Sequence, residues 1–377
     1  MRILIVFFLF SIVTICDAIT FQVGPERPYR TPSEVAALIE DGDTIEIDAG
    51  IYTNDVAVWR KNNLTIRGKG GRAHIRAIGK HAEGKGIWVI KGNNTTIENI
   101  EFSGAKVPDG NGAGIRQEGA NLTVRLCYFH DNENGILSGK NLNSDITIEH
   151  TEFAHNGSGD GYTHNMYIGE IRNFTIKFSY SHSAVIGHQI KSRAHNNFIL
   201  YNKLLDKKNG NSSYIIDVSN GGNTFIIGNI IQQGEKTDNS TLVAYGMENL
   251  LYKENSLFII NNTFVNNRHA GVFIRTAEKT PTAKIVNNLF IRKGTLLIGA
   301  GELNNNLRTD HPGFVGEDNH NYRLQASSPA VDKGIKLSTH NGFNLTPEYE
   351  YKHKTKSQKR SITKKIDLGA YEYRKKH

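Results

Sequence analysis

The sequence predicts an all-β solenoid, namely a single-stranded right-handed parallel β-helix of about nine to eleven coils. A phrase of two apolar residues separated by four others recurs about nine times, at intervals of roughly 23 to 33 residues, which is typical of stacked repeats. Within each repeat the apolar residues fall in short β-branched runs broken by Asn-Gly, Gly-Asn and Asn-Asn pairs. Such runs and breaks indicate strands and turns, and no helical period is sustained within the repeats.

The recurring phrase distinguishes this solenoid from two others. Its anchor positions hold Ile, Val and Phe, whereas leucine-rich repeats need Leu and propeller blades need about 40 or more residues per repeat. The clear copies span 97–102, 124–129, 148–153, 199–204, 226–231, 259–264 and 285–290, and weaker copies begin at 66 and 176. We therefore expect each repeat to be one coil, with like residues stacked on like residues one coil later.

Asparagine recurs at one place in these coils, three residues after the anchor, at Asn202, Asn229, Asn262 and Asn288. If these side chains stack, each amide can bond the next at about 1 kcal/mol net per bond. Asparagine is also typical of turns. Both interpretations support the predicted fold.

The N-terminal residues predict a cleaved signal peptide over 1–18. Residues 3–16 form an apolar run after a single Arg, and the small residue Ala18 provides the cut. The run is too short to favour a membrane span. Its removal leaves Cys127 without an intramolecular disulfide partner. These features predict a secreted or periplasmic protein without a membrane span.

Residues 19–335 are predicted to form the β-helix together with an N-terminal cap. Residues 31–39 have the apolar spacing of one short amphipathic helix, with Ser33 as the candidate N-cap. Such a helix would cover the open strand edges of the first coil. Strands then begin near Asp41. One elongated domain, expected to be monomeric, is favoured over two domains because a solenoid grows by adding coils.

The C-terminal segment 336–377 is basic and is predicted to pack back through 366–372. Residues 351–377 hold ten Lys or Arg and two acidic residues, which accounts for the whole formal net charge of +8. The coils are therefore neutral overall, and the absence of a basic stripe argues against a nucleic-acid partner. A charge run of this kind is typically solvated, with contact to an anionic polymer as the minority interpretation.

Charged and aromatic residues of mixed type gather between 155 and 248. If Met166, Ile190 and Ile216 point inward, strand alternation turns the residue after each of them outward on successive coils. The catalytic candidates are Lys191, Arg193, His188, Tyr167 and His164. The candidate substrate-binding residues are Asn165, His182, Gln189, Asp217, Tyr245 and Arg275.

Such a row suits an anionic sugar polymer. Elimination across a uronate needs a cation that neutralises the carboxylate, a base for the C5 proton and an acid at the leaving O4. Lys191 or a histidine is the candidate base, Arg193 or Arg275 the neutraliser, and Tyr167 or a histidine the acid. A lysine base needs a pKa lowered by about 2 to 3 units, which a neighbouring cation and partial burial can supply. The alternative is that these cations are solvated strand residues and the histidines only pack.

Asp217 has three candidate roles: it can bind substrate, orient a histidine or contribute to a Ca²⁺ site. No spacing in the sequence specifies a metal loop. The sequence therefore assigns no cofactor and no metal ligands, and Ca²⁺ is the one candidate.

The coils, together with residues 328–334 and 367–372, resemble bacterial secreted β-helix proteins of the pectate-lyase-like superfamily. Within it, the Lys-Ser stretch at 190–192, followed by Asn197 and Asn202, looks like that of the alginate and chondroitin-B lyase family. The resemblance implies that Lys191 is the base. That family carries an Arg on the next coil, where this chain has Asp217, so its neutralising group has no direct match unless Arg193 substitutes.

The leading hypothesis is a polysaccharide lyase that acts on a uronate-containing acidic polysaccharide. A uronate C5 epimerase would use the same proton and return it from the other face. Polygalacturonase-type hydrolases share the fold and use paired Asp residues with a Gly-His-Gly; Gly187 and His188 echo this pattern, but the chain has no Asp-Asp pair. A non-catalytic carbohydrate-binding β-helix would explain the exposed Tyr and Arg equally well.

Overall fold

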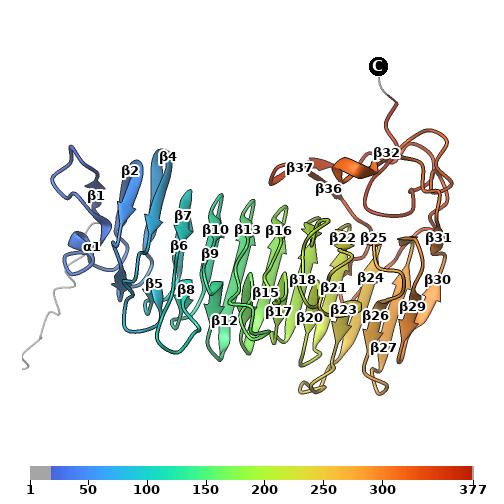
Figure 1. Cartoon of the computed structure of the whole chain (residues 1–377), viewed down its shortest axis with the longest axis horizontal. Coiled ribbons are helices and arrows are strands. Elements are labelled where there is room, and N and C mark those ends of the chain that lie inside the picture. Colours follow the sequence, from blue (N-terminus) through green and yellow to red (C-terminus); the bar gives the residue numbers. More distant parts are fainter. Residues whose placement is uncertain (1–17, 376–377) are drawn as a thin grey trace, which may run out of the picture.

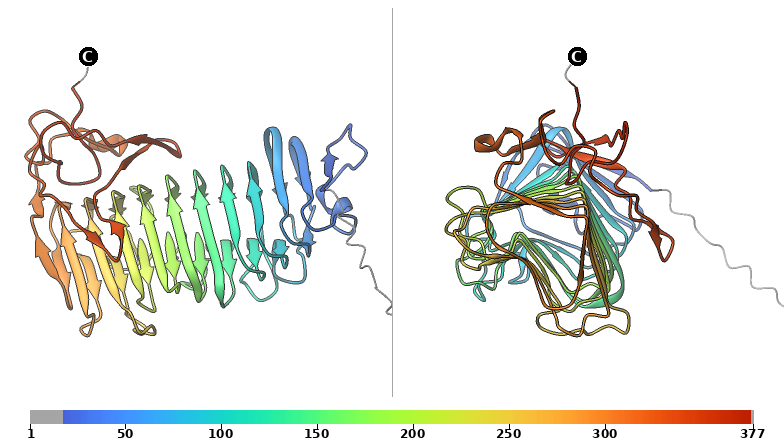
Figure 2. Two further views of the ribbon diagram at one scale, coloured as in Figure 1. Left: turned by 180° about the vertical axis from the view of Figure 1, so that it is seen from behind. Right: turned by 90° about the vertical axis from the view of Figure 1, so that its right-hand side faces the viewer.

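The computed structural model describes residues 18–375, in which parallel strands wind into stacked coils along one long axis (Figure 1). The predicted signal peptide, apart from Ala18, lies outside the described residues. Strands pair in parallel within a 21-stranded sheet and a 10-stranded sheet. Seen end-on, the coils superimpose on one another (Figure 2). The predicted right-handed parallel β-helix is confirmed.

Anchors stack on anchors, as the repeat predicts. Strands β15 (Ile171–Lys177), β18 (Asn196–Leu200), β21 (Asn223–Ile227), β24 (Ser256–Ile260) and β27 (Thr282–Val286) align in parallel. Their register places five isoleucines in one column, each fully buried: Ile176, Ile199, Ile226, Ile259 and Ile285. A second column stacks the rings of Phe102, Phe129 and Phe153 at 5.0 and 4.9 Å. The hydrophobic core is therefore a set of columns inside the coils.

The asparagines form a buried ladder. The side-chain amide of Asn202 donates to Oδ1 of Asn229 at 3.0 Å, and Asn229 donates in the same way to Asn262, also at 3.0 Å. Asn262 donates in turn to Asn288, and Asn288 donates to Asn306, again at 3.0 Å. Each rung also accepts the backbone N–H of the preceding rung. The stacking interpretation is confirmed, and the ladder ties neighbouring coils together at the bend between two walls.

The N-terminal cap is smaller than predicted. The helix α1 (Pro32–Val35) has a single turn, and its N-cap is Thr31, which makes no side-chain capping bond. The expected capping role of Ser33 is therefore wrong, because its backbone N–H instead donates to the Asp55 carboxylate at 3.2 Å. Pro32 at the start of the helix fixes that turn. The fully buried side chains of Val35 and Ile39 still close the end of the core.

The coils end earlier than the predicted boundary at 335. The last wall strands are β29 (Thr295–Ile298), β30 (Glu302–Asn304) and β31 (Leu307–Thr309). The chain then turns and runs back over the coils as the C-terminal segment, here residues 310–375. This segment includes the hairpin β36 (Tyr349–Lys352) and β37 (Lys356–Lys359), which lies along one side of the solenoid (Figures 1 and 2).

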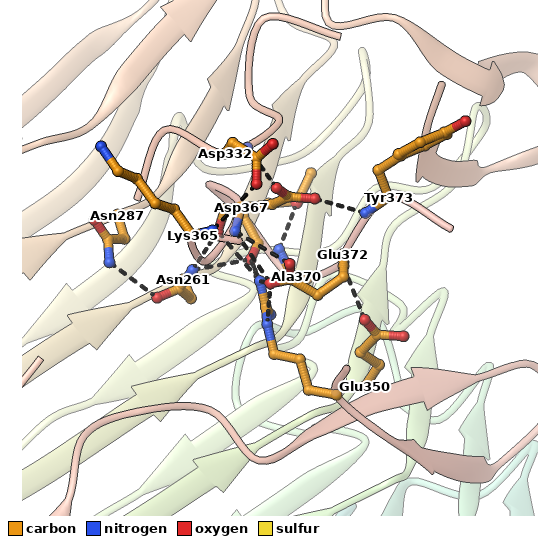
Figure 3. A network of polar contacts seen from close by, with 12 residues as sticks. Asn261, Asn287, Asp332, Glu350, Lys365, Asp367, Ala370, Glu372 and Tyr373 are labelled. Atoms are coloured by element: carbon orange, nitrogen blue, oxygen red, sulfur yellow. Dashed lines mark hydrogen bonds and ion pairs between the residues drawn. The ribbon is translucent and has the colours of Figure 1, made fainter. Parts of the chain in front are cut away.

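A buried polar network anchors the C-terminal segment. Both carboxylate oxygens of Asp367 accept backbone N–H groups at 2.6 Å, one from Asp332 and one from Tyr373 (Figure 3). Asn261, from the coils, donates to the carbonyl oxygen of Asp367 at 2.8 Å. The fully buried guanidinium of Arg360 pairs with Glu372 at 2.5 Å. Part of the predicted basic tail is therefore interior structure.

No helix among the described residues is long and apolar enough to cross a membrane. Cys127 is buried and forms no disulfide with any residue that the structure describes, and burial raises the pKa of its thiol to about 12. A thiol with this pKa stays protonated and unreactive near neutral pH.

Candidate functional site

The ten-stranded sheet carries the predicted row of polar residues on its outer face. Strands β14 (Met166–Ile168), β17 (Ile190–Ser192) and β20 (Ile216–Val218) lie side by side. Their register pairs Tyr167 with Lys191 and Lys191 with Asp217. Met166, Ile190 and Ile216 are fully buried. The coils therefore bring these three outward residues together on successive turns.

Lys191 is held by two carboxylates. Its amine lies 3.2 Å from Oδ2 of Asp217 and 3.0 Å from Oε1 of Glu248. Burial alone would lower the pKa of Lys191, but the two carboxylates outweigh burial and raise it above the ordinary lysine value. The expectation of a lowered pKa is wrong, because the nearest charged partners of this amine are anions. In the resting site Lys191 is a cation.

Arg193 completes a cation pair with Lys191. Its guanidinium contacts Oε2 of Glu248 at 2.5 Å and donates to the Tyr167 hydroxyl at 2.7 Å and to Asn220 Oδ1 at 2.6 Å. The side chains of Lys191 and Arg193 are 13% and 21% exposed, whereas that of Glu248 is 48% exposed. A half-exposed carboxylate therefore bridges two largely shielded cations.

The buried histidines His164 and His188 adjoin the row, with Nε2 of His188 3.6 Å from Oδ2 of Asp217. Their rings stack at 4.5 Å, and Nδ1 of His164 accepts the backbone N–H of His188 at 3.1 Å. Burial, and then the charge of Lys191, lower the pKa of His188 to about 3. Burial also lowers the pKa of His164 well below its ordinary value, with His188 and Lys191 adding to the effect. Both rings are neutral near pH 7, so neither supplies a cation to the site.

Asp217 and Glu248 have environments that push their pKa values apart. Burial raises the pKa of Asp217, although Lys191 and the Ser219 hydroxyl at 2.8 Å partly oppose this effect. Burial also raises the pKa of Glu248, but the hydrogen bonds from Lys191 and Arg193 outweigh burial and lower the net pKa of this carboxyl. A pair of titratable groups with opposed shifts is a frequent feature of acid–base sites.

Several predicted site residues lie elsewhere. Tyr245 is fully buried, and its hydroxyl donates to the carbonyl oxygen of Gly222 at 2.6 Å, so its predicted outward position is wrong. In the register of the sheet, Asp217 pairs with Ala244 on the next coil, and Ala244 pairs with Arg275 on the coil after that. Arg275 therefore lies in the row, two coils beyond Asp217, and its buried Nε has no hydrogen-bond partner among residues 18–375.

Asn165 and Gln189 are also fully buried, so their predicted exposure to substrate is wrong. Each precedes its strand at a corner of the coil, where strand alternation does not apply. The amide of Asn165 donates to Oε1 of Gln189 at 2.6 Å and accepts from Asn156 at 2.9 Å, which makes a second internal ladder. These residues position the corner from which β14 and β17 start.

His182 does not belong to the row. It lies on β16 (Tyr180–His182) in the other sheet, where its Nε2 faces Oε1 of Glu152 at 3.2 Å. Its predicted role in the same site is therefore wrong, because β16 belongs to the 21-stranded sheet and the row lies on the ten-stranded sheet.

Sequence reasoning missed Glu248 and Asn220 as members of the site. Glu248 follows β23 (Thr241–Tyr245) in a turn and stands 57 positions from Lys191. The Gly246 before it, at φ 68°, marks a tight turn beside the row. That glycine is the signal in the sequence that the chain turns beside the sheet here.

The surroundings of Asp217 do not suit a calcium ion. Ca²⁺ takes about 6 to 8 oxygen ligands, whereas Asp217 offers one carboxylate that already faces an ammonium at 3.2 Å. This arrangement therefore gives calcium no role at Asp217.

No family model matches the sequence, and neither does any curated protein. Among solved structures, pectate lyase Pel9A is similar at a TM-score of 0.52 and 14% identity, over 96% of this chain and 98% of that chain. ORF18 of Geobacillus virus E2 matches at 0.47 and 13%, over 72% and 53%. Pectin methylesterase PemA from Erwinia chrysanthemi matches at 0.34 and 10%, over 71% and 81%. At such identities the similarity is one of fold, and the chain is a right-handed parallel β-helix with the fold of the pectate lyase.

Proposed function

We propose that the protein binds a uronate-containing acidic polysaccharide along the outer face of β14, β17 and β20 and cleaves it by β-elimination. The observation that carries the proposal is the carboxylate of Glu248 lying across Lys191 and Arg193. A uronate carboxylate has the same charge and the same planar pair of oxygens. Because Glu248 is half-exposed and the cations are shielded, a substrate carboxylate can take its place.

In this proposal Arg193 neutralises the substrate carboxylate, which acidifies the proton on C5. Deprotonated Lys191 accepts that proton, the bond between C4 and O4 breaks, and a double bond forms between C4 and C5. The Tyr167 hydroxyl, held by Arg193 at 2.7 Å, donates a proton to the departing O4. Fixed donors and cations of this kind typically supply about 10²–10³ in rate each.

The raised pKa of Lys191 sets a condition on this reaction. The amine must lose its proton before it can act as a base, and its ordinary pKa is already about 10.4. The rate should therefore rise with pH through the alkaline range. A profile that peaks below neutral pH would contradict a lysine base.

A specific observation favours hydrolysis as a second candidate. Asp217 and Glu248 contact the same ammonium at 3.2 and 3.0 Å, so these oxygens lie no more than about 6 Å apart, a limit that admits the roughly 5–5.5 Å separation of retaining glycosidases. Asp217, with a raised pKa, would be the acid, and Glu248 the nucleophile. The sequence lacks paired Asp, but the fold assembles a carboxylate pair from two coils.

One assay separates these candidates. The purified protein is incubated with pectate, alginate, glycosaminoglycans and bacterial exopolysaccharides across neutral to alkaline pH. Elimination yields products with ultraviolet absorption from the new double bond, and hydrolysis yields reducing ends without it. A C5 epimerase changes the NMR spectrum of the polymer without shortening it. If no substrate changes in any of these ways, the catalytic proposal fails and a binding role remains.

Variants at Lys191 then test the assignment. Lys191→Ala should lose at least about 10²-fold in turnover while polymer binding, supported by Arg193, persists. Lys336→Ala, an exposed lysine in the C-terminal segment, is the matched control and should behave like the parent. Equal turnover in both variants would exclude Lys191 as the base.

A further inference from the structure

A second cluster of ionisable side chains lies on the other sheet, outside the candidate site described above. It occupies the outer face of β4 (Thr65–Arg76), β7 (Ile100–Ser103) and β10 (Tyr128–His130), which pair in parallel on successive coils. His74 pairs in register with Glu101, and His130 pairs with Ser103 one coil later. We propose that His74, Glu101 and His130 bind a divalent transition-metal ion of the Zn²⁺ type.

The ligand atoms have the spacing that such an ion requires. His74 Nδ1 lies 3.4 Å from Oε1 of Glu101, and His130 Nε2 lies 3.1 Å from the same oxygen. All three ligand atoms lie within 4.8 Å of one another. Tetrahedral zinc with bonds of about 2.0–2.1 Å holds its ligand atoms about 3.3 Å apart. The observed separations therefore accommodate an ion with little movement of the side chains.

The other nitrogen of each imidazole is anchored. His74 Nε2 is 2.7 Å from the Ser103 hydroxyl, and His130 Nδ1 is 2.6 Å from Oδ2 of Asp131. Metal-binding histidines usually bond through their second nitrogen in this way, which fixes the ring and the tautomer. The ring of Tyr128 also stacks on His130 at 4.4 Å. Both rings are therefore held with one nitrogen directed at Glu101.

The composition of the cluster indicates which ion and which kind of site. Two imidazoles and one carboxylate suit zinc, cobalt or nickel, whereas calcium and magnesium prefer oxygen ligands alone. The three side chains are 17%, 23% and 17% exposed, so the cluster is open to solvent on one side. Three protein ligands with an open fourth position are typical of zinc sites that bind water or an anionic oxygen of a ligand.

The experiment uses the full chain, free of any purification tag and stripped of metal with a chelator. Titration with Co²⁺ should give stoichiometric visible absorption of tetrahedral cobalt, and Zn²⁺ should displace it. Zn²⁺ should also raise the unfolding temperature, because an ion that binds only the folded state stabilises it. Glu101→Gln, which keeps the side-chain shape, and His74→Ala should each abolish the cobalt spectrum.

Two further variants complete the test. Asp131→Asn should weaken binding by about 10 to 100-fold, as expected for a residue that only orients a ligand. His155→Ala removes an exposed imidazole near the same sheet and should bind cobalt like the parent. If His74→Ala does not fold, Glu101→Gln decides alone. A parent chain that binds no cobalt stoichiometrically, or a Glu101→Gln chain that binds it equally well, would overturn the proposal.

Discussion

The amine of Lys191 lies 3.2 Å from Oδ2 of Asp217 because the two residues are direct partners in the parallel register of β17 and β20. This contact places a cation and a buried anion on adjacent coils of an outer wall. Glu248 then closes the arrangement from a turn, bonded to Lys191 at 3.0 Å. Most of the behaviour expected of the site follows from these three charges.

Glu248→Gln should increase affinity for anionic polysaccharide by about 2- to 5-fold, because it removes a competing partially exposed ion pair worth up to about 1 kcal/mol. It should also lower the pKa of Lys191 and shift any alkaline pH–rate profile to lower pH. Binding by calorimetry and the pH dependence of rate measure both effects. Glu254→Gln makes the same charge change at an exposed neighbour and should leave both unchanged. Equal affinities and equal pH profiles of the two variants would show that Glu248 does not compete with the polysaccharide for Lys191 and Arg193.

Acid should destabilise the fold through its buried neutral histidines. Burial, partly opposed by Glu152, lowers the pKa of His182 to about 4, and burial with the charge of Lys191 lowers that of His188 to about 3. Unfolded imidazoles titrate near about 6.5, so the unfolded chain binds more protons as pH falls from about 6.5 to about 4. We expect a loss on the order of 1–3 kcal/mol per histidine.

Denaturant unfolding at several pH values from neutral down to the acid range measures this loss. His182→Gln should reduce the slope of the stability curve over that range, whereas Gln at the exposed His311 should not. A parent chain with constant stability throughout would contradict the buried neutral state of these rings.

Lys203 should cost the protein stability at neutral pH. Burial, followed by the charges of Lys207 and Arg323, lowers its pKa to about 8. Its amine borders a cavity of about 420 Å³ under the C-terminal segment, also lined by Asn319, His320, Asn321, Arg323, Lys352, His353 and Tyr371. Because the unfolded amine keeps its proton up to about pH 10.4, stability is lowest below pH 8 and rises as pH increases between these two values.

Lys203→Met should therefore raise the unfolding free energy at pH 7 by about 1–2 kcal/mol and flatten the rise above pH 8. Equilibrium unfolding at both pH values measures the change. Lys208→Met, at an exposed neighbour, is the control and should change little. A less stable Lys203→Met chain would mean that the bond to the His320 carbonyl at 3.0 Å outweighs desolvation.

Asn262→Ala should destabilise the chain by about 2–4 kcal/mol, because it removes a donor and leaves buried ladder partners unsatisfied. The lost bonds include those to the carbonyl oxygen of Ile226 at 2.8 Å and to Asn288 at 3.0 Å. Chemical unfolding measures the change, with Asn111→Ala at an exposed loop as the control. A cost below about 0.5 kcal/mol would show that the ladder marks a turn and adds no stability.

The coils and the stack of Tyr167, Lys191 and Asp217 could be predicted from the sequence, because each depends only on counting from an anchor. The same count left the asparagines open between a stacked ladder and turn residues. The alternation of inward and outward residues does not hold at the corners of the coils, where the side chains of Asn165 and Gln189 are buried. The strand β23 reads Thr-Leu-Val-Ala-Tyr and is buried throughout, so it has no alternation of apolar and polar residues. The sequence therefore did not indicate that Ala244, and not Tyr245, occupies the outward position beside Asp217.

Contacts between distant segments were also outside the reach of counting. Glu248 reaches Lys191 from a turn, and the pKa direction of Lys191 depends on that contact. The cluster of His74, Glu101 and His130 depends on the relative rotation of side chains on three coils. No local pattern in the sequence carries that information.

The C-terminal segment also changes how the array can come apart. Its backbone and side chains bond to coils far from one another, including Lys354 to Glu152, Glu348 to Tyr201 and Gly369 to Asn287. A solenoid normally frays one repeat at a time from its ends. Because of these contacts, we expect the C-terminal half of the array to unfold as one cooperative block. The first coils, which lie outside these contacts, can still unfold one at a time.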